Sequence, residues 1–296
     1  MTADKNPGDE NTGHMNTGDQ NTVVENTTSE NPAAEHVART AGRLAEYGFF
    51  IDFDGTLSPI QDDPESVAPV PGALDALTAL TAEAGLVAVV SGRPVAFLGS
   101  RLGTIPGLGL HGLYGLEYSS DGGRTVATAP QAEPYTPVIA RVVAEARAAF
   151  PETLVEDKRL SVSLHFRTAP ALEPAIEAWT SERAEAYGLL RQHGRMVVEL
   201  KPPLDTDKGA IVLERASGLA GAWYFGDDLG DLPAFIALDK LAAQDRGFHA
   251  VRVAVGTAEG RGAALAGHAD LRLSAPQRVP ALLNSLLSAH RTAGAP

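Results

Sequence analysis

The sequence contains no cysteine and no long apolar run. Without cysteine among its 296 residues, the chain can form no disulfide, thiolate nucleophile or cysteine-ligated zinc site, and a reducing cytoplasm is its expected location. No run of 18 or more apolar residues offers a membrane-spanning helix. The first residues lack the basic start and apolar core of a signal peptide. We therefore expect a cytoplasmic protein with no membrane partner.

The sequence also lacks an excess of positive charge. It has 24 Lys and Arg against 37 Asp and Glu, which gives a net charge of −13. Nucleic acids and anionic membranes bind basic surfaces, so this balance argues against both as general partners. An anionic small molecule can still bind where a few cations or a metal ion reverse the local field.

The first 35 residues differ from the rest of the chain. Asparagine recurs there every five residues, from Asn6 to Asn31, a period that matches neither a helix nor a strand. Bulky apolar side chains are too few to offset the entropy lost on ordering. We predict a disordered tail over residues 1–35.

Apolar segments after this tail alternate in the manner of an α/β protein. Residues 49–51 and 86–90 resemble buried parallel strands, and a helix with apolar residues on one face is expected between them. The same rhythm returns near the C-terminal end, with expected strands at 222–225 and 251–255. The order predicts an α/β fold built on a parallel sheet.

A different pattern interrupts this rhythm. Residues 160–167 alternate between apolar and polar side chains, which is typical of an antiparallel strand with one face in the core. We therefore predict a second domain at residues 118–200, inserted into a core domain formed by residues 36–117 and 201–296.

Two carboxylates, those of Asp52 and Asp54, directly follow the first predicted strand. Ligands of open parallel sheets bind at the carboxyl ends of the strands. Like charges at this spacing repel one another, and a shared divalent cation such as Mg²⁺ relieves the repulsion. One carboxylate of such a pair can attack phosphorus while the other transfers a proton. Taken alone, the pair is explained equally well by two solvated loop carboxylates.

Three further elements lie beside predicted strands. The first is the turn Ser91-Gly92-Arg93, whose hydroxyl and backbone N–H groups can hold phosphate oxygens. Lys208 begins a helix and can neutralise a phosphate and a nucleophilic aspartate. Asp227 and Asp228 follow a strand and can complete a metal site. Each element has a simpler explanation: an ordinary Ser-Gly turn, a solvated lysine, and helix-capping aspartates, among which Asp231 is a candidate.

The four elements in this order resemble the four motifs of the haloacid dehalogenase (HAD) superfamily of aspartate-nucleophile phosphatases. One class of that superfamily carries an α/β cap between the second and third motifs, which is where the predicted insertion lies. The resemblance implies a Rossmann-like HAD core with a parallel sheet and an inserted α/β cap domain of the C2 type.

A narrower resemblance, to the trehalose-6-phosphate phosphatases, covers about residues 45–290. The segments that carry it are residues 52–60, 89–93, 111–117, 155–158, 160–167, 199–202 and 207–209. The chain departs from the family at a few positions. Gly230 and Leu232 stand where the family usually has Thr and Glu, Arg159 stands where it often has Gly, and Lys201 stands where Arg is common.

The resemblance implies a role for each core motif. Asp52 is the expected nucleophile, and Asp54 the acid that protonates the leaving sugar oxygen and then activates water. Mg²⁺ is expected on Asp52, the backbone carbonyl of Asp54, and Asp227, with Asp228 in support. The expected phosphate contacts come from Lys208 and from the substrate-binding residues Thr56, Ser91, Gly92 and Arg93.

The resemblance also implies which residues contact the sugar. Glu117, Lys158 and Glu199 match positions that bind sugar hydroxyls. His165 and Arg167 lie on the polar face of the predicted strand, where they either face the substrate or are merely solvated.

These observations lead to one hypothesis and two alternatives. The hypothesis is a Mg²⁺-dependent phosphatase that converts trehalose 6-phosphate into trehalose and phosphate through an aspartyl-phosphate, with trehalose-phosphate synthase as a candidate partner. The first alternative is a phosphatase for another sugar phosphate, such as sucrose 6-phosphate or a mannosyl phosphoglycerate. The second is a non-catalytic subunit that binds a sugar phosphate.

Overall fold

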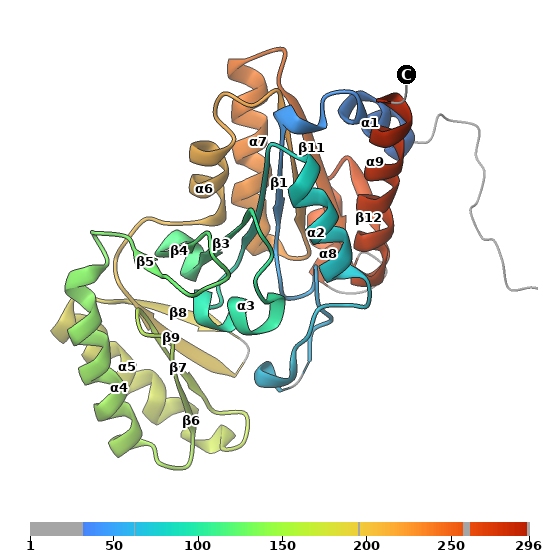
Figure 1. Ribbon diagram of the computed structural model, residues 1–296. Helices are drawn as coiled ribbons and strands as arrows, with labels where there is room; N and C mark the ends of the chain where they lie inside the picture. Colours follow the sequence, from blue (N-terminus) through green and yellow to red (C-terminus); the bar gives the residue numbers. More distant parts are fainter. Residues whose placement is uncertain (1–31, 62, 195, 257–260, 295–296) are drawn as a thin grey trace, which may run out of the picture. The chain divides into compact units, whose positions relative to one another are not determined.

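The computed structural model describes residues 32–296 apart from 62, 195, 257–260 and 295–296 (Figure 1). The strands of its larger sheet are β1 (Tyr47–Ile51), β2 (Leu86–Val90), β3 (Leu108–Gly112), β4 (Glu117–Ser119), β5 (Ala127–Thr128), β10 (Gly221–Gly226), β11 (His249–Val255) and β12 (Leu271–Leu273). Their order is β12-β11-β10-β1-β2-β3-β4-β5. All pairings are parallel except those of β4 and β5, which form an antiparallel edge.

The central strands are apolar on both faces because each face meets its own layer of helices. Phe49 and Ile51 of β1 enter one hydrophobic core, and Phe50 between them enters the other. The first core is covered by α2 (Ala73–Glu83), α3 (Val95–Leu102), α9 (Val279–Ala293) and α1 (Pro32–Ala41). The second is covered by α6 (Lys208–Arg215), α7 (Leu232–Gln244) and α8 (Arg261–Ala266). Figure 1 shows α2 and α9 on one side of β1, and α6 and α7 on the other.

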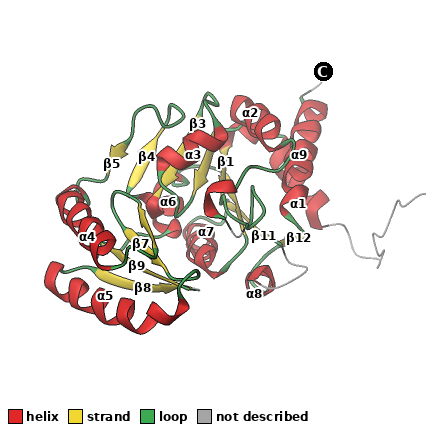
Figure 2. Ribbon diagram, turned by 90° about the horizontal axis from the view of Figure 1, so that it is seen from below, coloured by secondary structure: helices red, strands yellow, loops and turns green. Residues whose placement is uncertain are grey.

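A second sheet is built from the middle of the chain. Its strands are β6 (Leu154–Asp157), β7 (Val162–His165), β8 (Leu190–Gly194) and β9 (Val197–Lys201), in the antiparallel order β6-β7-β9-β8. The helices α4 (Thr136–Ala149) and α5 (Glu173–Tyr187) cover one face of it (Figure 2). We call residues 136–201 the cap segment. The predicted fold class, an α/β core with an inserted α/β unit, is therefore confirmed.

Three predicted boundaries need correction. Residues 32–35, expected to belong to a disordered tail, form the first turn of α1, because this helix packs on the larger core through Ala33 and Val37; residues 1–31 lie outside the described residues. Residues 118 and 119 pair with β3, and β5 extends the same sheet. We therefore propose that the inserted domain begins after β5 and not at residue 118. The strand expected at 160–167 is shorter, and Arg167 lies in the turn that follows it.

In the described part of the chain, no helix combines the length and the apolar character needed to cross a membrane.

Two histidines of the larger sheet make stability depend on pH. Burial lowers the pKa of His111 to about 4, and burial likewise lowers the pKa of His249 to about 4. In the unfolded chain each histidine takes up a proton below pH of about 6.5. The contribution of each histidine to the free energy of unfolding is therefore fully present above that pH and is lost as the pH drops towards 4. For His111 the loss is up to about 3 kcal/mol.

We predict that His111→Phe removes its share of this acid sensitivity. The side chain packs on Tyr118 with a centroid distance of 4.8 Å, and its Nε2 atom has no hydrogen-bond partner in the part of the chain that the structure describes, so a phenyl ring can replace it. Urea unfolding measures the free energy of unfolding at pH 7 and at pH 5. Its fall between these two pH values should be about 2 kcal/mol smaller in His111→Phe than in the unmodified protein. His268→Gln, at an exposed position, is the control. An equal loss in His111→Phe and in the unmodified protein would contradict the prediction.

Candidate active site

Segments far apart in the sequence meet at the carboxyl end of the parallel strands. Asp52 directly follows β1, Ser91 follows β2 and Asp227 follows β10, while Lys208 is the first residue of α6. The strands β10, β1 and β2 are neighbours in the sheet. Their ends therefore bring these side chains together, as the order of the motifs predicts.

Lys208 lies at the centre of this group. Its Nζ donates to Asp52 Oδ1 and to Asp231 Oδ1, both at 2.6 Å, and all three side chains are buried. Burial alone lowers the pKa of Lys208, but the charges of Asp231 and Asp52 outweigh it and raise the pKa above its ordinary value. Lys208 is therefore a buried cation held by two carboxyl groups.

Asp231 holds the loop after β10 together. Its Oδ1 also accepts a hydrogen bond from the Tyr224 hydroxyl at 2.7 Å. Its Oδ2 accepts from the backbone N–H groups of Asp227 at 2.9 Å and Asp228 at 3.2 Å. The sequence predicted Asp231 as a candidate helix cap in a run of acids that could complete a metal site; its place as the third acid in Gly226-Asp-Asp-Leu-Gly-Asp231 was the signal for this larger role.

The acidic side chains are close enough to share a cation. Carboxylate oxygens of Asp52, Asp227 and Asp231 all lie within 4.8 Å of one another. Burial raises the pKa of Asp52 well above its usual value against the effect of Lys208, and burial and neighbouring acids raise that of Asp227 to about 7. Three buried carboxylates facing one lysine leave an excess of negative charge. A divalent cation with a preference for oxygen ligands fits this donor set.

Not all of these acids are equally available to a metal. The two oxygens of Asp231 already accept four hydrogen bonds, so Asp52 and Asp227 are the better ligands. Asp228, expected to support the metal, is not part of the close group; its Oδ1 caps the turn that follows by accepting from the Gly230 N–H at 2.8 Å.

The loop after β1 is shaped to approach Asp227. Gly55 has a φ of +84°, and a Cβ added there would lie 2.1 Å from Asp227 Oδ2. Only glycine allows this contact. The next residue, Thr56, is fully buried, and its hydroxyl has no hydrogen-bond partner among the described residues. That hydroxyl is therefore available to a ligand held by the loop.

Asp54 is paired with the turn after β2. Arg93 donates through Nε and Nη2 to the two Asp54 oxygens, at 2.8 and 2.9 Å. Within the turn, Ser91 Oγ accepts from the Arg93 N–H at 3.1 Å. A bidentate pair of this kind fixes the orientation of the carboxylate. The structure thus brings Asp54 and Arg93 together at the edge of the Asp52–Lys208 group.

Tyr114 bounds the site on one side. No motif of the sequence indicated this residue. A Cβ on Gly92 would lie 2.8 Å from the Tyr114 hydroxyl, so the ring rests on the backbone of this turn. Burial, and after it the charge of Glu199, raises the pKa of Tyr114 to about 12. The residue has a φ of +57°, an unusual conformation for a non-glycine residue.

A cavity of about 570 Å³ adjoins Asp54 through its partner Arg93. Residues of the larger sheet and its helices line one part, including Glu117 and Phe97; the loop after β6 lines the other with Lys158 and Arg159. The cavity is therefore bounded by both the core and the cap segment, and it is large enough for a small-molecule ligand.

Most of the residues expected to contact a sugar form a charged network beside this cavity. Lys158 Nζ lies 3.3 Å from Glu199 Oε1 and 3.9 Å from Glu156 Oε2. His165 Nε2 lies 2.9 Å from the same Glu156 oxygen. The exposed Arg167, in the turn after β7, is not among the residues that line the cavity.

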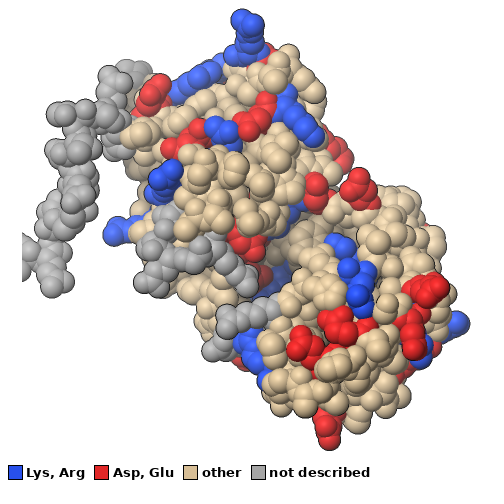
Figure 3. Space-filling view, turned by 180° about the vertical axis from the view of Figure 1, so that it is seen from behind, with Lys and Arg blue, Asp and Glu red and all other residues tan. Residues whose placement is uncertain are grey.

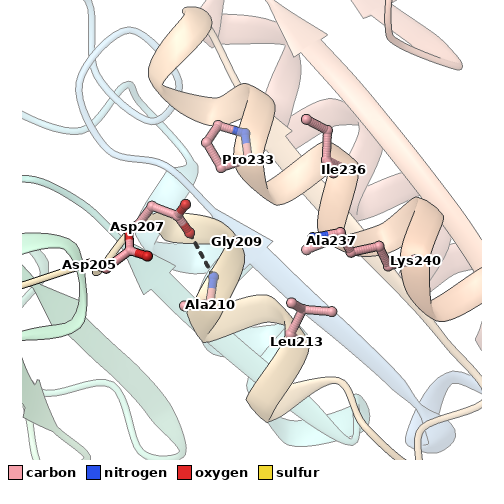
Figure 4. A pocket seen from close by; sticks show the side chains of 9 residues that line it. All are labelled: Asp205, Asp207, Gly209, Ala210, Leu213, Pro233, Ile236, Ala237 and Lys240. Atoms are coloured by element: carbon pink, nitrogen blue, oxygen red, sulfur yellow. Dashed lines mark hydrogen bonds between the residues drawn. The ribbon is translucent and has the colours of Figure 1, made fainter.

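A second cavity, of about 360 Å³, lies between α6 and α7 (Figure 4). Asp207 at its edge caps α6, because its Oδ1 accepts from the Ala210 N–H at 2.8 Å. The cap fixes the start of the helix that carries Lys208, and Lys208 itself is not among the residues that line this cavity. Figure 3 shows acidic and basic side chains interspersed over one face of the molecule.

Comparisons with known proteins are consistent with this geometry. Residues 50–266 match the family model described as trehalose-phosphatase. The trehalose-phosphate phosphatase of Mycobacterium avium (strain 104) is 38% identical over 200 residues, which are 64% of this chain and 50% of the relative. That of Mycobacterium tuberculosis (strain H37Rv) is 38% identical over 197 residues, 63% of this chain and 50% of the relative. The chain thus spans about half the length of these relatives.

Solved structures share the fold. A trehalose-6-phosphate phosphatase related protein superposes with a TM-score of 0.66 at 22% identity, over 83% of this chain and 99% of that one. The C-terminal domain of a Candida albicans trehalose-6-phosphate phosphatase gives a TM-score of 0.66 at 20% identity, over 89% of this chain and 99% of that one.

We predict that Asp231→Asn destabilises the protein by about 2–4 kcal/mol, because an amide nitrogen in place of one carboxylate oxygen cannot accept from the Asp227 and Asp228 N–H groups. Urea unfolding measures the change. Tyr224→Phe, which removes one hydrogen bond to the Asp231 side chain, is the matched control and should cost about 1 kcal/mol. If the two variants lose the same small amount, Asp231 does not hold this site together.

Proposed function

Since the chain belongs to the trehalose-phosphatase family, we propose that it hydrolyses trehalose 6-phosphate to trehalose and inorganic phosphate. The observation that carries the proposal is the buried group formed by Asp52, Lys208 and Asp227 at the carboxyl end of the sheet. A nucleophile, a cation and a metal ligand are what phosphoryl transfer through an aspartate requires.

In the proposed reaction, an Asp52 oxygen attacks phosphorus and the bond between phosphorus and the sugar oxygen breaks. Asp54 gives its proton to that oxygen as trehalose leaves. Asp54 then takes a proton from water, which attacks the phosphorus of the aspartyl-phosphate. The bond to Asp52 breaks, inorganic phosphate forms, and the carboxylate of Asp52 is restored.

The surrounding groups stabilise the negative charge of the phosphoryl oxygens. Lys208 is positioned to do so because Asp231 holds its Nζ beside Asp52. The Ser91 hydroxyl and the N–H groups of its turn are the expected hydrogen-bond donors. A divalent cation, which we propose to be Mg²⁺, would be held by Asp52 and Asp227, and by the backbone carbonyl of Asp54 as the resemblance implies; it would supply further positive charge.

The alternatives are distinguished by chemistry. A phosphatase for another sugar phosphate would share the core site and differ at the cavity. A non-catalytic sugar-phosphate-binding subunit has no chemical need for Asp52, Asp54, Lys208 and Asp227 together. Trehalose-phosphate synthase remains a candidate partner, because its product is the proposed substrate.

The test is phosphate release from trehalose 6-phosphate with Mg²⁺, and from the same mixture with excess EDTA. We expect turnover that EDTA abolishes and added Mg²⁺ restores. Asp52→Asn should lower kcat by about 1000-fold or more, because it removes the nucleophile. Its unfolding transition serves as the control for an intact fold.

Two results would contradict the proposal. A kcat/KM at least tenfold higher on another sugar phosphate would overturn the choice of substrate and leave the phosphatase. No turnover of any phosphate ester with Mg²⁺ would favour the binding subunit.

A further inference from the structure

Arg159 reaches from the cap segment to the larger sheet. Its Nε donates to Glu117 Oε1 in β4 at 2.9 Å, and its Nη2 donates to the Thr128 hydroxyl in β5. Arg159 therefore stands where the two sheets meet, on the wall of the 570 Å³ cavity.

The backbone at this residue is the kind that favours glycine. Arg159 has a φ of +68° in the tight turn between β6 and β7, where the Asp157 carboxylate accepts from its N–H at 2.8 Å. A side chain is disfavoured in this conformation. Arginine gains nothing from this backbone conformation itself. Its presence at this position therefore points to a function of its side chain.

Glu117 is not available to a ligand in this chain. One of its carboxylate oxygens accepts from Arg159, and the other accepts from the N–H of Val95, the first residue of α3, at 2.8 Å. Its side chain is only 4% exposed. A sugar in the cavity would therefore contact Arg159, the partner of Glu117, before it contacted Glu117 itself.

Arg159 is exposed enough, and has enough free hydrogen-bond donors, to bind a sugar. The Arg159 side chain is 48% exposed. A guanidinium carries five N–H donors, and the two bonds described above use two of them. The ion pair with Glu117 holds the planar group in one orientation, so little further entropy is lost when it donates to hydroxyl oxygens.

We propose that Arg159, and not Glu117, contacts the sugar hydroxyls on this wall of the cavity, and that it helps to determine which sugar phosphate is preferred. Glu117 acts as a positioning residue that orients the guanidinium and caps α3. The inference rests on the proposed function, because it assumes that the cavity holds the sugar of a phosphate ester.

The experiment compares two substrates, trehalose 6-phosphate and p-nitrophenyl phosphate, which has no sugar. In Arg159→Gly, the ratio of kcat/KM on the sugar phosphate to kcat/KM on the aryl phosphate should fall at least tenfold, mainly through a higher KM. The unfolding midpoint is measured alongside, because glycine relieves the left-handed backbone while the buried Glu117 loses its cationic partner. Arg124→Ala removes an exposed arginine outside the cavity and controls for the lost charge.

Glu117→Gln separates the two roles. Its amide oxygen can still accept from one donor, so the ratio should fall less than in Arg159→Gly. A larger fall in Glu117→Gln would show that Glu117 is the sugar ligand and would overturn the proposal. An unchanged ratio in Arg159→Gly, with trehalose 6-phosphate preferred by the unmodified protein, would overturn it and leave the proposed function intact. If the unmodified protein prefers no sugar phosphate, the proposed substrate fails and the inference fails with it.

Discussion

The site depends on one buried cation held between two carboxylates. Lys208 has Asp52 on one side and Asp231 on the other, each at 2.6 Å, in surroundings that exclude water. A charge in such a place is stable only with partners, and each of its partners is equally costly to bury alone. The group therefore forms as a unit, and it forms only when β1, β10 and the start of α6 are all in place.

The rest of the core serves to bring those elements into place. Alternating apolar residues of β1 and β10 enter two separate helix-covered cores, which leaves the strand ends little freedom to move. Asp231 then connects the loop after β10 to Lys208 through four hydrogen bonds. Gly55 lets the loop after β1 touch Asp227. Rigid support of this kind is what a site needs to hold its reacting groups in register.

The cap segment forms one wall of the 570 Å³ cavity. Its charged residues Lys158 and Glu199 face one another beside the cavity, while Arg159 joins the segment to Glu117 on the core. In the proposed reaction the core group binds the phosphate, which many esters share. Discrimination between esters must therefore come from the residues around the cavity. A wrong ligand would leave polar side chains there without a hydrogen-bond partner, which weakens its binding.

The sequence by itself determined the α/β class, the inserted unit and the meeting of Asp52, Lys208 and Asp227, because neighbouring parallel strands end at one edge of a sheet. Only the tertiary structure decided that Arg159 pairs with Glu117, 42 residues away. The same holds for the four hydrogen bonds of Asp231 and for the position of Tyr114 over Gly92. Local patterns report which face of an element is apolar. They do not report which polar side chains meet across two sheets, since that depends on how the elements pack.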